Sequence, residues 1–277
     1  MTSEPTFEST SQSQSQSQSL SEETDGVAVQ HGLAGLLDAT GQHPFVRWEV
    51  TGDLADTWWR HDRGVAFQRV RRADRRTVNL LGADDDVAPL LDALPRIAAV
   101  VSPGRRALSV SVPQHLEREV RRRYRVLEGG DWEWLHTTVP PPEDESHERV
   151  RPIDDRARAA EITAFLAAHS PTADTAPGHG ERWFAIEADD GSLCAVAAWG
   201  STHAGAPHLS SVAVDTRLRG SGLGRAIVGA LTRRAVAEAG VCTLGMYSHN
   251  AVARALYLSL GFDRLCAWSS RAVIIDR

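Results

Sequence analysis

The chain has 277 residues, of which 30 are basic and 36 acidic, and its formal net charge is −6. This length allows one or two domains with a sizeable core, and the negative charge does not indicate general nucleic-acid binding. The sequence has no apolar run of transmembrane length and no signal-peptide core at its N-terminus. We therefore expect no nucleic-acid partner and no membrane association.

The cysteines indicate a cellular compartment. Cys194, Cys242 and Cys266 lie on or beside apolar runs that are typical of strands. Buried free thiols in a reducing environment fit this placement, so we predict a cytoplasmic protein. No Cys-x-x-Cys or His-Glu-x-x-His spacing occurs in the sequence, and we predict no metal site.

Residues 1–26 are rich in serine and glutamine, with a Ser-Gln repeat at residues 11–19. Such a segment buries too little apolar area to offset its ordering entropy, which predicts a disordered tail. Residues 27–138 follow as a smaller α/β domain. Its expected helices are 30–39, 87–98 and one ending near 124, and its expected strands are 45–50, 65–70, 77–81, 108–112 and 132–135.

Residues 139–148 contain Pro140-Pro141-Pro142 and several acidic side chains. This composition is typical of a stiff polar linker between domains. The second domain, 149–277, should begin with a strand at 150–153, a helix ending near 168 and a loop at 170–181. Further strands are expected at 183–188, 193–200, 208–214, 241–247, 265–269 and 271–275, with one helix on each side of strand 241–247.

The most informative stretch is Arg219-Gly220-Ser221-Gly222-Leu223-Gly224, which follows the apolar strand Val212-Ala213-Val214. Leu223, Ile227 and Leu231 then place one apolar stripe along a helix. Because glycine has no Cβ, a ligand can approach this main chain closely. Amides at a helix N-terminus favour an anion, and Arg217, Arg219 and Arg225 add positive charge. The stretch predicts a pyrophosphate site, with an unliganded tight turn as the alternative.

A second stretch follows strand 241–247. Asn250 suits a helix N-cap, and Gly261 suits the left-handed position at the other end. Tyr257 lies about two turns after Asn250, so both should point to a similar side. The expected buried face of this helix comprises Val252, Ala255, Leu256 and Leu260.

Together the two stretches closely resemble the GCN5-related N-acetyltransferase (GNAT) family. The resemblance rests on Arg219 to Gly224 after Val212-Ala213-Val214, and on Asn250, Ala253-Arg254, Leu256-Tyr257 and Leu260-Gly261-Phe262. It covers about residues 148–277. It implies an α/β GNAT fold, with a mixed central sheet flanked by helices, preceded here by the smaller domain.

The resemblance also implies a reaction, in which the acetyl group of acetyl-CoA passes to a primary amine of a small molecule by direct attack. Tyr257 would protonate the departing thiolate, with plain packing against the helix as its alternative. The alternatives for the whole protein are an acetyltransferase for protein N-termini or lysines, and a non-catalytic acyl-CoA-binding module. The sequence leaves the oligomeric state open, a homodimer included. The implied cofactor-binding residues are Val212, Ala213, Val214, Arg219, Gly220, Ser221, Gly222, Leu223, Gly224, Arg225 and Asn250.

The general base is less determined. Many relatives carry a glutamate on the strand before the loop, where this chain has His208, Ser210 and Ser211. His208 is one candidate because an unperturbed histidine pKa lies near ~6.5. Glu187 is the other candidate, and a chain of water molecules is the alternative to both. His179 and Glu181, in the loop 170–181, are candidates for contact with the acceptor.

The first half echoes the second. Setting Leu108 against Leu244 places Gln114 at Asn250 and Trp132 at Trp268 without a gap. We infer an internal duplication with a degenerate GNAT-like first copy, with a chance match of two strand–helix–strand units as the alternative. Arg121 occupies the position of Tyr257, and acidic residues 84–86 occupy the place of the phosphate loop. The first half is therefore predicted not to bind the cofactor.

Overall fold

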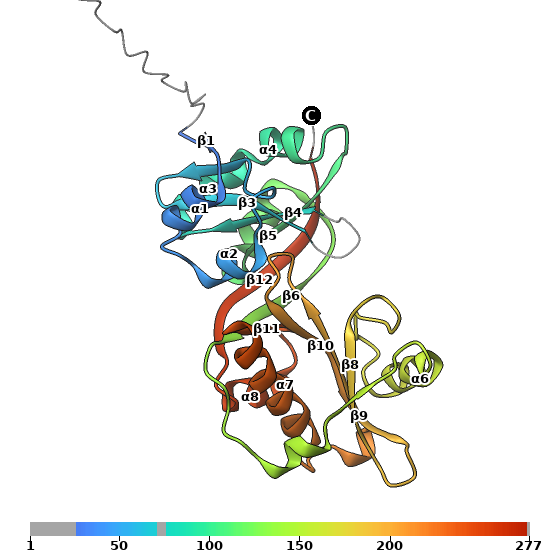
Figure 1. The fold of residues 1–277 in the computed structure, drawn as a ribbon. Helices are drawn as coiled ribbons and strands as arrows, with labels where there is room; N and C mark the ends of the chain where they lie inside the picture. The colour runs from blue at the N-terminus through green and yellow to red at the C-terminus, as the bar shows by residue number, and fades with distance from the viewer. Residues whose placement is uncertain (1–25, 71–75, 276–277) are drawn as a thin grey trace, which may run out of the picture.

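The structure, a computed structural model, describes residues 26–70 and 76–275. Apart from Gly26, the predicted disordered tail lies outside the described residues. The chain forms two lobes, the N-terminal half above and the C-terminal half below in Figure 1. Within the described ranges, one mixed sheet of 12 strands runs through both lobes. No helix in these ranges has the length and apolar character needed to cross a lipid bilayer.

The strands follow one another in the chain in two similar series. They are β1 (Ala28–Gln30), β2 (Trp58–His61), β3 (Gly64–Val70), β4 (Arg76–Leu81), β5 (Ala107–Pro113), β6 (Arg125–Thr137), β7 (Arg151–Ile153), β8 (Arg182–Glu187), β9 (Leu193–Ser201), β10 (Pro207–Val214), β11 (Cys242–Tyr247) and β12 (Asp263–Ile274). Their order across the sheet is β1-β2-β3-β4-β5-β12-β6-β11-β10-β9-β8-β7.

Helices cover both faces of this sheet. They are α1 (Leu33–Ala39), α2 (Pro44–Glu49), α3 (Asp84–Asp92), α4 (Leu94–Val101), α5 (Glu117–Arg123), α6 (Ala159–His169), α7 (Leu223–Ala239) and α8 (Ala251–Ser259), with short 3-10 turns η1 (Gln114–Leu116), η2 (Glu145–Arg149) and η3 (Thr216–Leu218). In the lower lobe, α7 and α8 lie on one side of the sheet and α6 on the other (Figure 1). The predicted α/β fold is confirmed.

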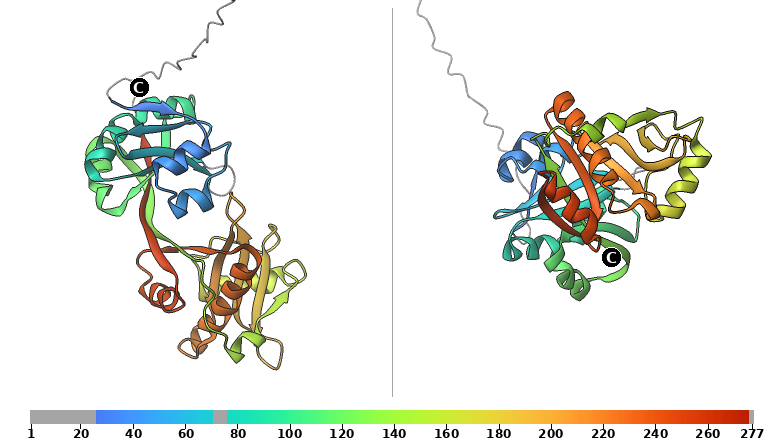
Figure 2. Two further views of the ribbon diagram at one scale, coloured as in Figure 1. Left: turned by 60° about the vertical axis from the view of Figure 1, so that its left-hand side comes forward. Right: turned by 90° about the horizontal axis from the view of Figure 1, so that it is seen from below.

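The two halves exchange their last strands. β6, the last strand of the N-terminal half, pairs along β11 from Thr137 to Trp132. β12, the last strand of the C-terminal half, pairs along β5 from Pro113 to Ala107. The long β12 therefore runs from the lower lobe into the upper one, as Figure 1 and the left view of Figure 2 show. Each lobe is completed by a strand of the other.

This exchange corrects the prediction of two strands at 265–269 and 271–275. The structure has one continuous strand there, because Ser270 between them stays in the ladder opposite Gly130 and Ser111. β11 has β10 on one side, and β6 occupies the position on its other side. Main-chain hydrogen bonds between strands are the same whichever half of the chain supplies the strand.

Two predictions in the N-terminal half are also wrong. Residues 45–49, expected in a strand at 45–50, belong to helix α2, because Pro44 occupies its first turn and the His43 ring accepts a hydrogen bond from the Phe45 amide. The single helix expected at 87–98 is two helices, α3 and α4. The acidic residues 84–86 form the first turn of α3, where negative charge is favourable.

The buried face of α8 agrees with the prediction in part. Leu260 is buried and Leu256 is partly buried against the core, as expected, whereas Val252 is 83% exposed and Ala255 is exposed. Tyr257 is buried as well. α8 therefore packs through the row that contains Ala253, Tyr257 and Leu260, which recurs at helical spacing. On α7 the predicted stripe is confirmed, because Leu223, Ile227 and Leu231 all lie in the core.

The two halves are related in their strand pairing. Each contains a parallel pair, β4 with β5 and β10 with β11. Trp132 and Trp268, the residues aligned in the proposed duplication, are direct partners in the antiparallel pair of β6 and β12. A two-fold relation between the halves would place equivalent residues opposite each other in this way. The pairing supports the duplication, which we keep as a proposal.

Candidate functional site

The sheet opens at β10 and β11. These parallel strands are paired at His208 with Thr243 and at Leu209 with Leu244. Beyond these pairs β10 continues beside β9 as far as Val214, and β11 continues beside β6 as far as Tyr247. The two strands therefore separate beyond Leu209 and Leu244. A separation inside a sheet leaves main-chain groups available to an extended ligand.

A β-bulge lies where the strands separate. The register of β10 against β9 shifts between Ser210 and Ala213, and Ser211 has a φ of 49°. Such a conformation is costly for a residue other than glycine and persists where neighbours hold it. Thr175 holds Ser211 in this conformation, because the Thr175 amide donates to Ser211 Oγ at 3.0 Å and Thr175 Oγ1 lies 2.7 Å from Ser210 Oγ. The loop at 170–181 is thus tied to the bulge.

The glycine-rich turn follows at the end of β10. Gly220 and Gly222 have φ values of 83° and 87°, and a Cβ on either would meet no atom within 4 Å. In the described part of the chain, the amides of Gly220, Gly222, Leu223 and Gly224 donate to no other main-chain or side-chain group. Donors collected at the N-terminus of α7 form an anion-binding arrangement.

The arginines around this turn already have protein partners. Hydrogen bonds from the Arg217 side chain lower the pKa of Asp215 to about 2, so this carboxylate stays charged and is neutralised by Arg217. Arg219 donates to the His169 carbonyl at 2.7 Å, and Arg225 donates to Ser259 Oγ at 2.7 Å. Arg219 thus joins the turn to α6, and Arg225 joins α7 to α8.

The second signature helix, α8, lies against the same turn. A Cβ on Gly224 would lie 3.5 Å from Leu256 Cδ2 and 3.6 Å from Val214 Cγ2. The end of β10, the first turn of α7 and α8 therefore meet at Gly224. Asn250 begins α8 as its N-cap, and its side chain accepts the Ala253 amide at 3.0 Å.

Tyr257 is buried in the core beneath α7, with its ring 5.9 Å from that of Phe262. Burial raises the pKa of Tyr257 to about 12, and the Cys242 thiol adds to the effect. The phenol is therefore protonated at neutral pH and can act as a proton donor. Tyr257 also packs in the core, and its role as proton donor stays a prediction.

His208 lies on the opposite face of the sheet. Leu209 belongs to the core under α7, and successive side chains of a strand alternate between faces. His208 Nδ1 is 2.9 Å from Thr243 Oγ1, and this hydroxyl also donates to the Pro207 carbonyl at 2.9 Å. A hydroxyl has one hydrogen, so both contacts are satisfied when Nδ1 carries a proton and donates. The imidazole lone pair then lies on Nε2.

Glu187, the other candidate base, is not brought near His208, where this opening begins. It lies opposite Leu193 at the end of β8, and its carboxylate pairs with Arg158. The adjacent Cys194 carbonyl accepts the Asp215 amide at 2.9 Å, so Glu187 is level with Asp215 rather than Leu209. At about 3.3 Å per residue, the strand from Leu209 to Asp215 spans roughly 20 Å.

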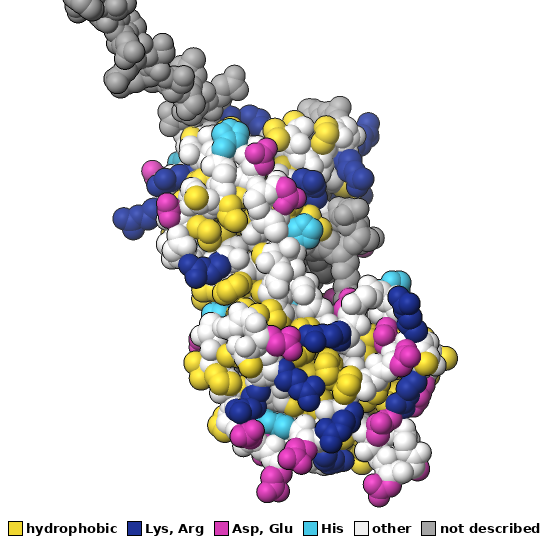
Figure 3. Space-filling model, viewed as in Figure 1, with side chains coloured by type: hydrophobic (Ala, Val, Ile, Leu, Met, Phe, Trp, Pro, Cys, Tyr) yellow, Lys and Arg dark blue, Asp and Glu magenta, His cyan; other side chains and the backbone are white. Residues whose placement is uncertain are grey.

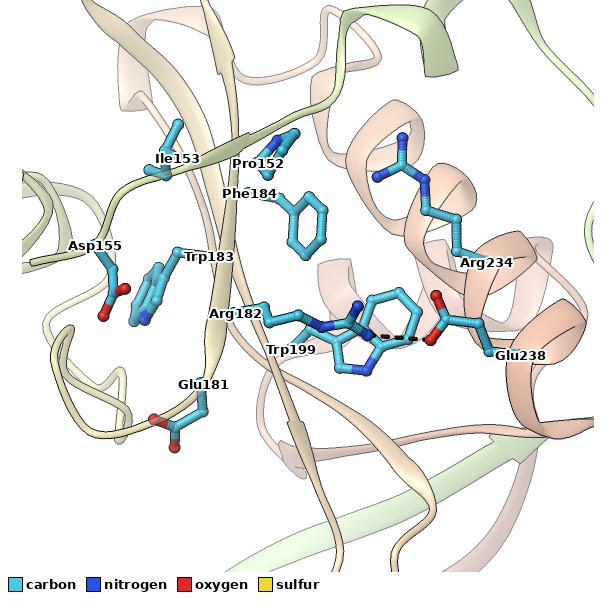
Figure 4. Close-up of a pocket in the computed structure, with 10 residues that line it drawn as sticks. All are labelled: Pro152, Ile153, Asp155, Glu181, Arg182, Trp183, Phe184, Trp199, Arg234 and Glu238. Carbon is cyan, nitrogen blue, oxygen red and sulfur yellow. Dashed lines mark hydrogen bonds and ion pairs between the residues drawn. The ribbon is translucent and has the colours of Figure 1, made fainter.

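Glu181, a candidate from the loop 170–181, borders a pocket of about 400 Å³ at the edge of β8 (Figure 4). Arg182 lies over the Trp199 ring at 4.3 Å and pairs with Glu238 at 3.2 Å. This pocket lies near the C-terminal end of α7, whereas the glycine-rich turn is at its N-terminal end. His179 is not among the lining residues.

Among the described residues, charged groups elsewhere do not form a comparable site. Figure 3 shows acidic and basic side chains interspersed on the face that it draws. In the N-terminal half, His61, Asp62 and Asp86 place their ligand atoms within 4.8 Å of one another. Arg60 and Arg63 line the same hollow, and their charge opposes a cation there.

Sequence reasoning missed Thr243 and Thr175. Thr243 contacts His208 because β10 and β11 are paired in one register, and Thr175 reaches Ser210 from a loop more than one element away. No local pattern signals either contact. His136 is a further missed residue, since it lies opposite Thr243 on β6 and so extends the same polar row.

Comparisons with known proteins agree with this geometry. The model of the acetyltransferase (GNAT) family matches residues 134–262, while no curated protein matches the sequence. A GNAT-family acetyltransferase from Colwellia psychrerythraea has a TM-score of 0.50 at 12% identity, covering 89% of this chain and 99% of that chain. A protein from Drosophila reaches 0.51 at 14% identity, covering 80% of each.

A GCN5-related N-acetyltransferase from Kribbella flavida has a TM-score of 0.47 at 17% identity, covering 88% of this chain and 96% of that chain. For the two structures with TM-scores of 0.50 and 0.51, identities of 12% and 14% indicate a shared fold alone. The family match begins within β6 and ends just after α8, so it contains the separated strands, the glycine-rich turn and both signature helices. The chain therefore carries, at residues 134–262, an acetyltransferase domain of the GNAT family.

Proposed function

We propose that this protein transfers an acetyl group from acetyl-CoA to a primary amine of a small molecule by direct attack. The family and the fold are those of acyltransferases. The observation that carries the finer proposal is the set of available amides of Gly220, Gly222, Leu223 and Gly224, at the end of a strand that has separated from its neighbour. One ligand with a pyrophosphate and an extended amide-bearing arm matches both features.

In this proposal the donor lies along β10. The amides of the glycine-rich turn hold its pyrophosphate, with Arg219, Ser221 and Arg225 at the rim of the turn. The pantetheine arm pairs with the strand at Val212–Val214 in the manner of an added strand. Asn250, whose Oδ1 caps α8, has its amide nitrogen to offer to the same arm.

The proton transfers use the two faces of the sheet. The acceptor ammonium loses a proton to His208 Nε2, and the free amine then attacks the thioester carbonyl. A main-chain amide at the bulge stabilises the resulting oxyanion. The carbon–sulfur bond breaks, and the departing thiolate takes a proton from Tyr257. The nitrogen loses its second proton to solvent as the amide forms, and solvent returns a proton to the Tyr257 phenolate. The positions of His208 and Tyr257 on opposite faces suit a base beside the acceptor and an acid beside the donor sulfur.

A small acceptor is favoured by the loop at 170–181. Thr175 ties this loop to the bulge through Ser210 and Ser211, so the loop covers the face on which His208 lies. A polypeptide acceptor would need a broader approach to that face. Free amines are therefore the first class to test, and peptide amines are the comparison.

The decisive experiment is calorimetric titration of the full chain with acetyl-CoA, followed by a screen of amine acceptors. We expect micromolar binding at one site per chain and turnover of free amines but not of peptides. The full chain is required because a 149–277 fragment would lack β6, the partner of β11 and β12. Absence of binding would refute the donor assignment, and turnover of peptides alone would replace the proposed acceptor class.

The base assignment gives a further prediction. Replacing His208 with Gln should lower turnover by about 100-fold or more, the usual size of a general-base contribution, and leave acetyl-CoA affinity unchanged. Thr243→Val should lower turnover as well, because nothing then holds the Nδ1 proton, whereas Thr243→Ser retains the hydroxyl and serves as the control. Steady-state kinetics with calorimetry separates the two effects. Normal turnover in His208→Gln would assign proton removal to water.

A further inference from the structure

The N-terminal half contributes a buried carboxylate to the helix that carries Tyr257. Glu133 lies on β6 and is 1% exposed. Its two carboxylate oxygens accept hydrogen bonds from Arg254 on α8, at 2.9 Å from Nε and 2.7 Å from the terminal nitrogen. Arg264 approaches one of these oxygens at 3.5 Å. Two charge-assisted bonds between one guanidinium and one carboxylate fix both distance and orientation.

The turn that leads into α8 is held from the same side. Arg254 also donates to the Ser248 carbonyl. Gln114, from the N-terminal half, donates its side-chain amide to Ser248 Oγ and lies 3.3 Å from the carbonyls of Trp132 and Trp268. Gln114 and Glu133 thus bind the start of α8 to the exchanged strands.

These polar contacts matter because α8 buries little apolar surface of its own. Its other contacts are the partly buried Ala253 and Leu256 on the core and the hydrogen bond from Arg225 to Ser259. Among its own residues, only Tyr257 is buried. Leu258 is 47% exposed and Val252 more so. A helix with so small an apolar contact takes its position from its specific bonds. Proton transfer requires a donor within hydrogen-bond reach of the departing atom, so a small displacement of α8 moves Tyr257 out of range.

We propose that Glu133 and Arg254 are a positioning pair, through which the N-terminal half sets the place of Tyr257. The inference rests on the proposed function, in which Tyr257 is the proton donor. It assigns a role in catalysis to a half that carries no glycine-rich turn of its own. Neither Glu133 nor Arg254 contacts the reacting atoms, so both act through Tyr257.

Under the proposed duplication, the positions aligned with Glu133 and Arg254 do not form an equivalent ion pair. The alignment that sets Trp132 against Trp268 places Ser269 opposite Glu133 and Arg118 opposite Arg254. Ser269 is buried but offers no charge, and Arg118 on α5 is exposed. The buried ion pair is therefore present only at the helix that carries the tyrosine.

The test uses Glu133→Gln and Arg254→Lys, which preserve side-chain size or charge. The control is Glu117→Gln, because Glu117 on α5 pairs with Arg271 of β12 at 3.2 Å and so also links the halves, without contacting α8. We expect both test variants to lower kcat by about 10- to 100-fold, the range that a displacement of about 1 Å can cause. Acetyl-CoA affinity should change by less than about threefold, and the control should behave as wild type.

Two readouts separate positioning from general destabilisation. In a Tyr257→Phe background, Glu133→Gln should cause no further loss of kcat, because the group it positions is absent. A full second loss would overturn the proposal. Hydrogen exchange at amides 251–259, measured without substrate, should be faster in Glu133→Gln than in Glu117→Gln. Equal exchange in the two variants would also overturn it.

The exchange measurement distinguishes this proposal from the proposed function. If the wild-type protein acetylates no amine, the proposed function fails on that result alone. Faster hydrogen exchange at the α8 amides in Glu133→Gln would then still establish that Glu133 links the N-terminal half to α8. Only the catalytic role assigned to Tyr257 would be refuted.

Discussion

Gly222→Glu should abolish acetyl-CoA binding and leave the folded structure in place. Gly222 is the N-cap of α7, with a φ of 87°, and a Cβ there would meet no atom within 4 Å. The new side chain therefore has room, although the left-handed backbone costs about 1–2 kcal/mol for a residue with a Cβ. Its carboxylate would stand where the pyrophosphate is expected. Like charges in contact cost several kcal/mol, which corresponds to a loss of affinity of about 100-fold or more.

Gly240→Glu is the matched control. Gly240 is the C-cap of the same helix, with a φ of 73° and no atom within 4 Å of an added Cβ. The Gly240→Glu substitution imposes a similar backbone cost and adds the same charge at the opposite end of α7. Calorimetry should give wild-type affinity for this variant. Equal losses in both variants would point to the stability of α7, and unchanged affinity in Gly222→Glu would refute the assignment of the turn.

Tyr257→Phe should retain acetyl-CoA binding and lower kcat by about 100-fold or more, the range of a general-acid contribution. The pKa of Tyr257 is raised to about 12 by burial. The acid form is present below this pKa, so ionisation of Tyr257 should not reduce kcat anywhere in the neutral range. Loss of the hydroxyl removes the proton donor and little apolar contact, because the ring still packs on Phe262.

Tyr124→Phe is the control for this measurement. Burial raises the pKa of Tyr124 to about 12 as well, and its hydroxyl donates to the Leu91 carbonyl in the N-terminal half. Its loss should lower the free energy of unfolding by about 1 kcal/mol, the usual net value of a hydrogen bond, without changing kcat. Normal turnover in Tyr257→Phe would transfer the role of proton donor to solvent.

Local sequence patterns determined much of the fold and the backbone geometry of the glycine-rich turn. The stripe of Leu223, Ile227 and Leu231 specifies α7, and glycines at 220 and 222 permit the left-handed turn before it. Asn250 caps α8 as expected. Each of these features depends on neighbours within a few residues, because helix periodicity, capping and turn conformation are short-range properties.

Features that depend on long-range pairing were decided only in the tertiary structure. Strand exchange between β6 and β12 brings Glu133 to Arg254, and the register of β10 with β11 brings Thr243 to His208. Glu187, on β8, is level with Asp215 and so lies far along the sheet from His208, where the opening begins. Main-chain hydrogen bonds between strands are chemically alike whichever strands they join. The apolar alternation of a strand therefore predicts that it pairs, whereas its partner and register follow from the packing of the whole chain.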